Sequence, residues 1–268
     1  MNKTFAFIGA GNMAYAIVGG LVNPKSAVSV SPSHIILFDA NPGQYEKFGD
    51  GFVIAEDISK ALTADIIVLA VKPQNYPDVL AQMRGTSFDG KIIISIAAGI
   101  STAYIESKLG DCAVVRTMPN TPLLIGKGVT ALCRNASVSD DDFSLIEQVF
   151  ASSGTTIRLE ERDMNKICAA TGSSPAYIFL MIKAICEGAA AQGIQCAYMR
   201  SAVCNMVIGS AALALESDKS LDELIRMVTS PKGTTEQALR VLHEADFEKT
   251  VMDAMDACTK RADELALS

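Results

Sequence analysis

The stretch Thr4-Phe5-Ala6-Phe7-Ile8 leads directly into Gly9-Ala10-Gly11-Asn12-Met13-Ala14, and residues 15–22 then have the composition of a helix. A short apolar run of this kind is typical of a buried strand, and the glycines break it. Gly9 permits a tight turn, Gly11 lets the backbone approach a pyrophosphate, and the final alanine is small enough for close helix packing. Strand, glycine turn and helix in this order predict a dinucleotide site, with a structural glycine turn as the alternative.

The strand pattern recurs through the first half of the chain. Continuous apolar runs are typical of parallel strands buried on both faces. The predicted strands after the first are residues 34–38, 65–71, 91–98, 112–116, 129–133 and 155–159. Ser139, with three acidic residues after it, is expected to begin a helix between the last two. The sequence therefore predicts an α/β Rossmann-type domain with a mostly parallel sheet.

Unusual loops follow several of these strands. Ligands of open α/β sheets bind beyond the carboxyl ends of the strands. The loops expected at that edge are the glycine turn, Lys72-Pro73-Gln74, Ala97-Ala98-Gly99 and Met118-Pro119-Asn120. We interpret them as one site. Lys72 is expected to act there, and the alternative is a solvated lysine at a strand end.

Asp39 ends the second predicted strand, where an acidic residue usually binds a ribose 2′-hydroxyl. Its charge would repel a 2′-phosphate, and the polar groups nearby are Asn41, Gln44 and Lys47, with no arginine beside them. By this reasoning the cofactor is NADH in preference to NADPH. The alternative is an aspartate that begins the turn Asn41-Pro42-Gly43.

Strand-like runs stop after residue 160, and helical segments rich in Ala, Met, Leu and Ile follow to the end. We therefore predict a Rossmann domain at residues 1–160 and an all-helical domain at residues 161–268. Small residues at 170–177 interrupt the first helical stretch. The segment 197–216 is apolar on every side, and such a helix must be buried. A domain of this size has little interior for it, so burial against a second subunit, in a homodimer or larger homo-oligomer, is expected.

A late stretch, Val228-Thr229-Ser230-Pro231-Lys232-Gly233-Thr234-Thr235, lies between two predicted helices. Pro and Gly fix a turn, and the helix after it offers unpaired N–H groups and a positive dipole end to an anion. The stretch is therefore a candidate seat for a small carboxylate, met by the N–H groups of Gly233, Thr234 and Thr235. The alternative is an ordinary turn between helices with a hydroxyl cap.

Composition excludes several classes of function. A net charge of −7 argues against a nucleic-acid partner. The longest uncharged stretches, such as residues 167–182, contain Gly, Ser and Pro and are short for a membrane span, so no membrane partner is expected. Seven scattered cysteines without a Cys-x-x-Cys pair, and no signal-peptide pattern, favour free thiols in the cytoplasm. The two histidines stand far apart, so no metal site or catalytic triad is predicted.

These motifs together resemble pyrroline-5-carboxylate reductase along nearly the whole chain. The resemblance covers the glycine turn, Ala70-Val71-Lys72-Pro73-Gln74, Arg116-Thr117-Met118-Pro119-Asn120-Thr121-Pro122, the turn at residues 172–177 and, most specifically, the late loop. It implies a Rossmann domain followed by an interleaved helical dimerisation domain. The implied reaction is hydride transfer from NADPH or NADH to the imine carbon of 1-pyrroline-5-carboxylate, which gives L-proline and ends proline biosynthesis.

The resemblance also implies roles for particular residues. Thr235 and Lys72 are the catalytic candidates, and Thr235 is expected to hydrogen-bond near the ring nitrogen. The implied substrate-binding residues are Ser230, Gly233, Thr234 and Thr235. The implied cofactor-binding residues are Ile8, Gly9, Ala10, Gly11, Asn12, Met13, Asp39, Asp57, Ala70, Val71, Lys72, Pro73, Ala97 and Ala98.

Three residues depart from the family pattern. Lys232 and Ser174 stand where glycine is common, and Asp57 stands where asparagine is frequent. Asp57 and Asp39 together weigh against NADPH. Two rival hypotheses stay open: a β-hydroxyacid-type dehydrogenase using Lys166 or Lys183, and a nucleotide-binding paralogue that has lost turnover.

Overall fold

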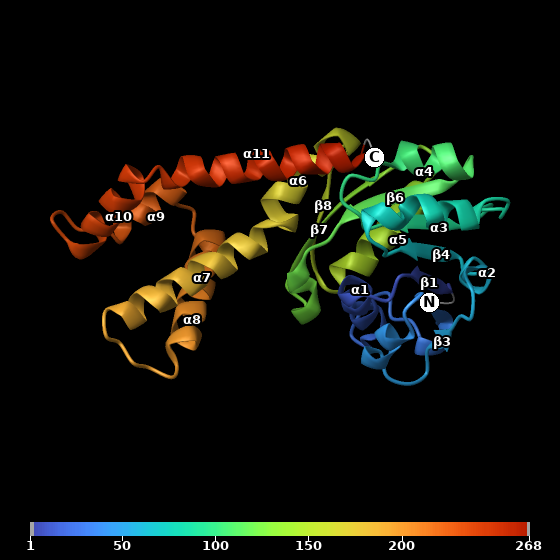
Figure 1. The fold of residues 1–268 in the computed structure, drawn as a ribbon, viewed down its shortest axis with the longest axis horizontal. Helices are drawn as coiled ribbons and strands as arrows, with labels where there is room; N and C mark the ends of the chain where they lie inside the picture. The colour runs from blue at the N-terminus through green and yellow to red at the C-terminus, as the bar shows by residue number, and fades with distance from the viewer. Residues whose placement is uncertain (1–2, 267–268) are drawn as a thin grey trace. The chain divides into compact units, whose positions relative to one another are not determined.

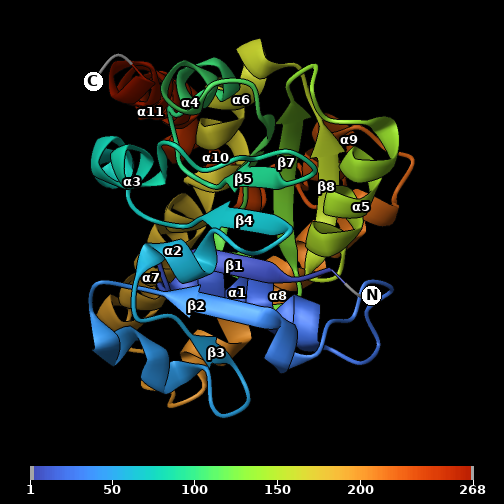
Figure 2. The same cartoon turned by 90° about the vertical axis from the view of Figure 1, so that its right-hand side faces the viewer.

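The apolar runs of the first half form one eight-stranded sheet in the computed structural model, which describes residues 3–266. The strand order is β3-β2-β1-β4-β5-β6-β7-β8, and Figure 2 shows these strands side by side. All neighbouring pairs are parallel except β6 and β7. The strands are β1 Phe5–Ile8, β2 Ile35–Phe38, β3 Val53–Ile54, β4 Ile66–Leu69, β5 Ile92–Ser95, β6 Ala113–Met118, β7 Gly128–Arg134 and β8 Gly154–Arg158. The predicted mostly parallel α/β sheet is confirmed.

Helices cover both faces of the sheet, because alternate residues of each strand bury on opposite sides. Phe5 and Phe7 of β1 belong to one apolar cluster, which also contains residues of α1 and α5. Ala6 and Ile8 belong to a second cluster with residues of α2, α3 and α4. Each large buried side chain contributes roughly 1.5–3 kcal/mol. The helices are α1 Asn12–Val22, α2 Ile58–Ala61, α3 Tyr76–Met83, α4 Thr102–Leu109 and α5 Asp140–Ala151.

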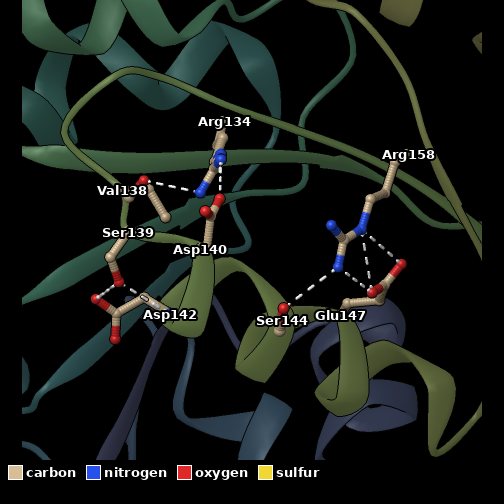
Figure 3. Close-up of polar contacts among 8 residues, drawn as sticks. All are labelled: Arg134, Val138, Ser139, Asp140, Asp142, Ser144, Glu147 and Arg158. Carbon is tan, nitrogen blue, oxygen red and sulfur yellow. Dashed lines mark hydrogen bonds and ion pairs between the residues drawn. The ribbon is translucent and has the colours of Figure 1, made fainter.

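Helix α5 begins as the sequence predicts. The hydroxyl of its N-cap, Ser139, accepts a hydrogen bond of 3.1 Å from the backbone N–H of Asp142 (Figure 3). Near its other end, Glu147 forms an ion pair of 2.7 Å with Arg158 of β8. The cap satisfies one of the free N–H groups at the start of the helix, and the ion pair joins α5 to the neighbouring strand.

Three details differ from the sequence predictions. Strand β3 was not predicted, because its two residues are too few for a detectable apolar pattern. Helix α1 begins at Asn12 and not at residue 15, because Gly11 already acts as its N-cap. Residues 170–177 were expected to interrupt a helix, but the helical path continues through a π-helix at Cys168–Gly172 into α7.

The remaining chain is helical and divides between two compact units. The first unit comprises the chain up to Pro175 together with the segment from Ala257, and the second is Ala176–Asp256. The domain boundary near residue 160 stays a prediction. The helices of this part of the chain, visible in Figure 1, are α6 Met164–Ile167, α7 Ser174–Ala191, α8 Met199–Glu216, α9 Leu221–Met227, α10 Thr234–Glu244 and α11 Phe247–Ala266.

The uncharged residues 167–182 lie within a longer helical stretch, Glu161–Ala191. It has 31 residues, a mean hydropathy of 1.2 in its most apolar window, and 11% of that window buried within the chain. By length and composition it could cross a bilayer. Helices of soluble proteins and signal sequences meet the same criterion, so this is weak evidence for a span.

The second unit exposes many apolar side chains in the single chain. Val203 is the one buried residue described in α8, whereas Ile208 is 57% and Leu215 is 87% exposed. In α7, Phe179 and Leu180 are more than half exposed. Apolar surface of this extent usually marks an interaction surface.

The Asp65 carboxylate, just before β4, hydrogen-bonds to Thr4, just before β1. Asp65 Oδ2 accepts hydrogen bonds of 2.7 Å from both the backbone N–H and the hydroxyl of Thr4. The backbone hydrogen bond is the main cause that lowers the pKa of Asp65 below its ordinary value of 3.8. Because the folded pKa is depressed, the stabilisation is complete above the unfolded pKa and is lost as pH falls through the folded pKa.

We therefore predict that Asp65→Asn lowers the free energy of unfolding by about 1 kcal/mol at pH 7, a value discounted for partial solvent exposure. The deficit should shrink as pH falls below the unfolded pKa of about 3.9. Urea denaturation of both proteins between pH 3 and pH 7, a range of about four units around that value, measures it. An unchanged deficit at the acidic end would contradict the prediction.

Candidate active site

The glycine turn at the end of β1 lies directly against the loop after β4. Gly9 has φ +100°, and a Cβ placed on it would lie 2.7 Å from the carbonyl atoms of Ala70. The Gly9 N–H donates to Phe38 O at 2.7 Å, and the Ala70 N–H donates to Ile8 O at 2.8 Å. Only glycine fits this close approach, which joins the ends of β1, β2 and β4.

The start of α1 has the features of an anion site. Its N-cap, Gly11, offers no side-chain hydrogen bond, and the first turn holds no acidic residue. A Cβ on Gly11 would meet nothing within 4 Å, so open space faces this backbone. The first-turn N–H groups of a helix have no partner within it and carry a partial positive charge. Asn12 and Met13 therefore present N–H groups suited to a pyrophosphate.

Asp39 braces the glycine turn. Its Oδ2 accepts the N–H of Ala10 at 2.7 Å, and its Oδ1 accepts the N–H of Asn41 at 2.8 Å. The structure therefore shows Asp39 in the alternative role considered above, as the residue that begins the turn at residues 41–43. An ionised carboxylate has about four acceptor positions, so the same group can also accept a ribose hydroxyl.

Asp57 lies just beyond β3, beside the end of β2. Its carboxylate caps α2 by accepting hydrogen bonds from the N–H groups of Ser59 and Lys60. The Ser59 hydroxyl bond is the main cause that lowers the pKa of Asp57. Asp57 thus adds a second negative charge at the edge where Asp39 lies.

The loop after β4 continues the same edge. Lys72 is exposed and precedes a short helical turn that begins at Pro73. No ion pair involves its ammonium group within residues 3–266. The backbone of Ala70 and Val71 lies closest to Gly9. Lys72 is therefore a cation available to a ligand at this edge.

The loops after β5 and β6 meet the π-helix. Ala98 packs against the apolar cluster that contains Met118. Ala97 is buried in the cluster that contains residues of α2, α3 and α4. Asn120 donates its Nδ2 to the carbonyl of Thr171 at 3.0 Å and accepts the N–H of Val129 at 2.8 Å. Asn120 therefore gives the Thr171 carbonyl a side-chain donor and joins the loop after β6 to the π-helix.

A buried ion pair was not anticipated from the sequence. Arg116 of β6 is 2% exposed, and its Nη1 lies 2.6 Å from Glu161 Oε1. Its Nη2 hydrogen-bonds to Asn165, which in turn donates to Asp263 of α11 at 2.7 Å. A signal was present, because an arginine that ends an apolar strand has to find a partner when the strand is buried.

The other oxygen of Glu161 extends this network. Glu161 Oε2 accepts the hydroxyl of Thr102, the first residue of α4, at 3.0 Å, and the thiol of Cys133 at 3.3 Å. Burial and the neighbouring Glu161 raise the pKa of Cys133. The network thus holds α4, which follows the Ala97–Ala98 loop, to β6, which leads into the loop with Asn120.

The candidate substrate loop lies in the second unit, between α9 and α10. Gly233 is the N-cap of α10, and a Cβ on it would lie 2.3 Å from Ser230 Oγ. Lys232 has φ +60°, a left-handed conformation that glycine adopts without strain. Its N–H donates to Glu236 Oε2 at 2.7 Å, so the acidic side chain turns back along the loop.

One expectation for this loop is wrong. The N–H of Gly233 was expected to face the substrate, but it donates to Ser230 O at 2.9 Å and closes the turn. The N–H groups of Thr234 and Thr235, in the first turn of α10, stay free of intrahelical partners. Within residues 3–266, no hydrogen bond engages the hydroxyls of Ser230, Thr234 or Thr235.

The predicted residues therefore fall into two groups. All the cofactor candidates lie in the first unit, in or next to the loops at the carboxyl ends of neighbouring parallel strands. The four substrate candidates lie together in one loop of the second unit. Lys166 and Lys183, the lysines of the rival dehydrogenase hypothesis, lie beside Asp163 and Glu187 at 2.8 Å and 3.6 Å.

Comparison with known proteins identifies the family. Residues 161–265 match the family model for pyrroline-5-carboxylate reductase dimerisation, and residues 4–99 match the model for NADP oxidoreductase, coenzyme F420-dependent. Pyrroline-5-carboxylate reductase of Escherichia coli is 35% identical over 272 residues, covering 100% of both chains. The chain belongs to the pyrroline-5-carboxylate reductase family. Its relative from Pseudomonas aeruginosa is 36% identical and covers 97% of this chain and 96% of its own.

Solved structures of pyrroline-5-carboxylate reductases have the same fold. The enzyme of Coxiella burnetii is 35% identical with a TM-score of 0.84, and 99% of each chain is covered. That of Plasmodium falciparum, solved with NADP bound, is 26% identical with a TM-score of 0.90, covering 99% of this chain and 98% of its own. A prephenate dehydrogenase at 13% identity shares the fold alone.

Membership in the pyrroline-5-carboxylate reductase family makes the chain an oxidoreductase that acts on a C=N bond. The dimerisation model over residues 161–265 also indicates a homo-oligomer. The exposed apolar helices α7 and α8 lie within that range, so a second subunit accounts for surface that a single chain leaves in water.

The Arg116–Glu161 pair makes a testable contribution to stability. Arg116 is the buried partner, whereas the Glu161 side chain is 36% exposed. Glu161→Gln leaves the buried guanidinium unpaired and should cost about 2 kcal/mol, a value discounted for the exposure of Glu161. Adding Arg116→Met to Glu161→Gln should restore part of that loss, because the unpaired buried charge is then gone. Urea denaturation of both single variants and the double variant measures the coupling, and strictly additive losses would contradict the prediction.

Proposed function

We propose that this member of the pyrroline-5-carboxylate reductase family binds the nicotinamide dinucleotide along the strand edge and the cyclic imine at residues 230–235. The observation that carries the proposal is the loop itself. Three hydroxyls that have no hydrogen-bond partner within residues 3–266, and the N–H groups of Thr234 and Thr235 that have none within their helix, lie at the start of α10. That combination suits a small carboxylate with a ring nitrogen beside it.

The dinucleotide fits the residues of the edge. The open space at Gly11 and the uncapped start of α1 are suited to a pyrophosphate. Ile8, Gly9, Ala10, Asn12 and Met13 form the loop around it. When bound, the reduced nicotinamide supplies the hydride that the imine carbon accepts.

The remaining work of the chain is binding and orientation. A protonated cyclic imine is a strong hydride acceptor, so little acid–base catalysis is required. The N–H groups of Thr234 and Thr235 would bind the carboxylate and fix the ring. Good orientation of two reactants can lower a barrier by roughly 7–11 kcal/mol. The Thr235 hydroxyl can donate to or accept from the ring nitrogen, so it serves either protonation state, with the proton coming from water.

Lys72 is proposed as the cation of the cofactor edge. Its ammonium group is exposed and lies outside every ion pair within the described residues. An amine in that place attracts a phosphate or an anionic substrate. Val71, Pro73, Ala97 and Ala98 would line the same edge through their backbone.

The choice between NADH and NADPH is proposed from charge. The family model and the Plasmodium relative are associated with NADP. In this chain Asp39 and Asp57 place two carboxylates at the ends of β2 and β3, where a 2′-phosphate would add negative charge. We propose that this pair shifts the preference towards NADH. We also propose a cytoplasmic enzyme, because all seven cysteines are free thiols.

Asp39→Asn tests the cofactor proposal. The amide keeps an acceptor for Ala10 or Asn41 and removes the charge, so KM for NADPH should fall severalfold while KM for NADH changes little. Asp57→Asn is a second test at the neighbouring strand end, and the charge argument predicts the same direction. Steady-state rates with each cofactor and 1-pyrroline-5-carboxylate measure this, and an unchanged ratio of the two KM values would limit Asp39 to bracing the glycine turn.

Thr235→Ala tests the substrate loop. Loss of the hydroxyl at the ring nitrogen should lower kcat/KM by at least tenfold, or about 1.4 kcal/mol. Thr229→Ala is the matched control, because the Thr229 hydroxyl already donates to Ile225 O at 2.6 Å and should leave kcat/KM unchanged. Thr235→Ser should recover most of the activity. An unchanged kcat/KM in Thr235→Ala would remove Thr235 from the mechanism, and turnover by neither the parent nor any variant would favour an inactive binder.

A further inference from the structure

Two cysteines lie where the chain leaves and re-enters the first unit. The chain passes into the second unit after Pro175 and returns at Ala257. Cys168 lies in the π-helix just before the first passage, and Cys258 lies on α11 just after the second. Both belong to the first unit, although the whole second unit separates them in sequence.

The two thiols share one hydroxyl. Cys258 Sγ lies 3.3 Å from Ser173 Oγ, and Cys168 Sγ lies 3.9 Å from the same atom. Cys258 also packs against the apolar cluster that contains Cys168. Burial and the neighbouring Cys258 raise the pKa of Cys168. Both sulfur atoms contact the same oxygen atom, so a change of side-chain rotamer is the movement that would bring them together.

We propose that Cys168 and Cys258 are an oxidative modification site, at which a peroxide converts the thiol pair into a reversible disulfide. Cys258, as its thiolate, attacks hydrogen peroxide and becomes a sulfenic acid, with hydroxide leaving. The Cys168 sulfur then attacks Cys258, the S–S bond forms, and the sulfenic oxygen leaves as water. Overall two thiols lose two electrons and two protons, and one peroxide is reduced to two waters.

The solvent accessibility of the two cysteines indicates which thiol reacts with the peroxide first. Cys258 is half-buried, so a small oxidant can reach it, whereas Cys168 is 7% exposed. Burial holds Cys168 as a thiol and makes it a poor first target. It is placed instead as the resolving partner that reacts once Cys258 is oxidised.

The other thiol of this cluster is engaged elsewhere. Cys133 donates to Glu161 at 3.3 Å, and Cys112 is buried within the apolar core on one face of the sheet. Cys186, Cys196 and Cys204 lie in the second unit. Among the described cysteines, only Cys168 and Cys258 hydrogen-bond to the same hydroxyl.

The disulfide would close a ring that contains the entire second unit. Both connections between the units would then be held at one covalent point in the first unit. Closing so long a loop reduces the conformational freedom of the unfolded chain. The oxidised protein should therefore resist thermal unfolding more than the reduced protein. This inference does not depend on which cofactor or substrate is bound.

The test treats the full-length reduced protein with hydrogen peroxide, blocks the remaining thiols and maps peptides by mass spectrometry without reduction. The expected result is a peptide that links Cys168 to Cys258, lost on treatment with dithiothreitol. The melting temperature should rise by at least about 5 °C on oxidation and return after reduction. Cys258→Ser, which keeps a hydrogen-bonding group beside Ser173, should fold normally and show neither the link nor the rise.

Three further observations complete the test. Cys196→Ser, a change at an exposed cysteine of the second unit, should keep both the link and the melting shift. Oxidation of Cys258 without the linked peptide would overturn the proposal, as would a link from Cys258 to another cysteine or to a second chain. Full resistance of both thiols to peroxide would also overturn it, because Cys258 is accessible in the proposed site.

Discussion

A guanidinium group buried in the sheet has to be paired, and much of the first unit is arranged around that requirement. Arg116 lies within β6, and Glu161 and Asn165 come from the segment that follows the last strand. Through Asn165 the network reaches Asp263 on the final helix. The same carboxylate holds the start of α4 through Thr102. Helix α11 is thereby attached to the sheet whose strand ends carry the candidate cofactor residues.

The sequence predicted the fold class because apolar runs and glycine turns are local signals. Phe5–Ile8 and Gly9 follow the rules for a parallel strand and a tight glycine turn, and the structure shows both; phosphate binding at the turn stays a prediction. Contacts between distant segments were not predictable in this way. Asp39 bonding to Ala10, and Asn120 bonding to Thr171, depend on which loops meet in space. The Gly233 N–H was misjudged because a turn inside the loop uses it.

The exposed apolar helices and the dimerisation family model both indicate a surface that binds a second subunit. An apolar face without a charged stripe gives no helical periodicity, so its burial was inferred from composition alone. The single chain leaves Leu215 and Phe179 in water. In a family with a dimerisation domain, this surface is exposed in the single chain because a second subunit is needed to bury it. Stability of the helical unit will then depend on protein concentration.

Lys232 affects how the candidate substrate loop is ordered. A lysine held at φ +60° costs roughly 1 kcal/mol of backbone strain relative to glycine. In the unfolded or open loop, however, lysine has fewer backbone conformations to lose than glycine. Glu236 and the Ser230–Gly233 turn then fix the strained backbone in place. These bonds hold the loop backbone in the absence of a ligand, so the carboxylate proposed to bind there would lose less affinity to ordering of the loop.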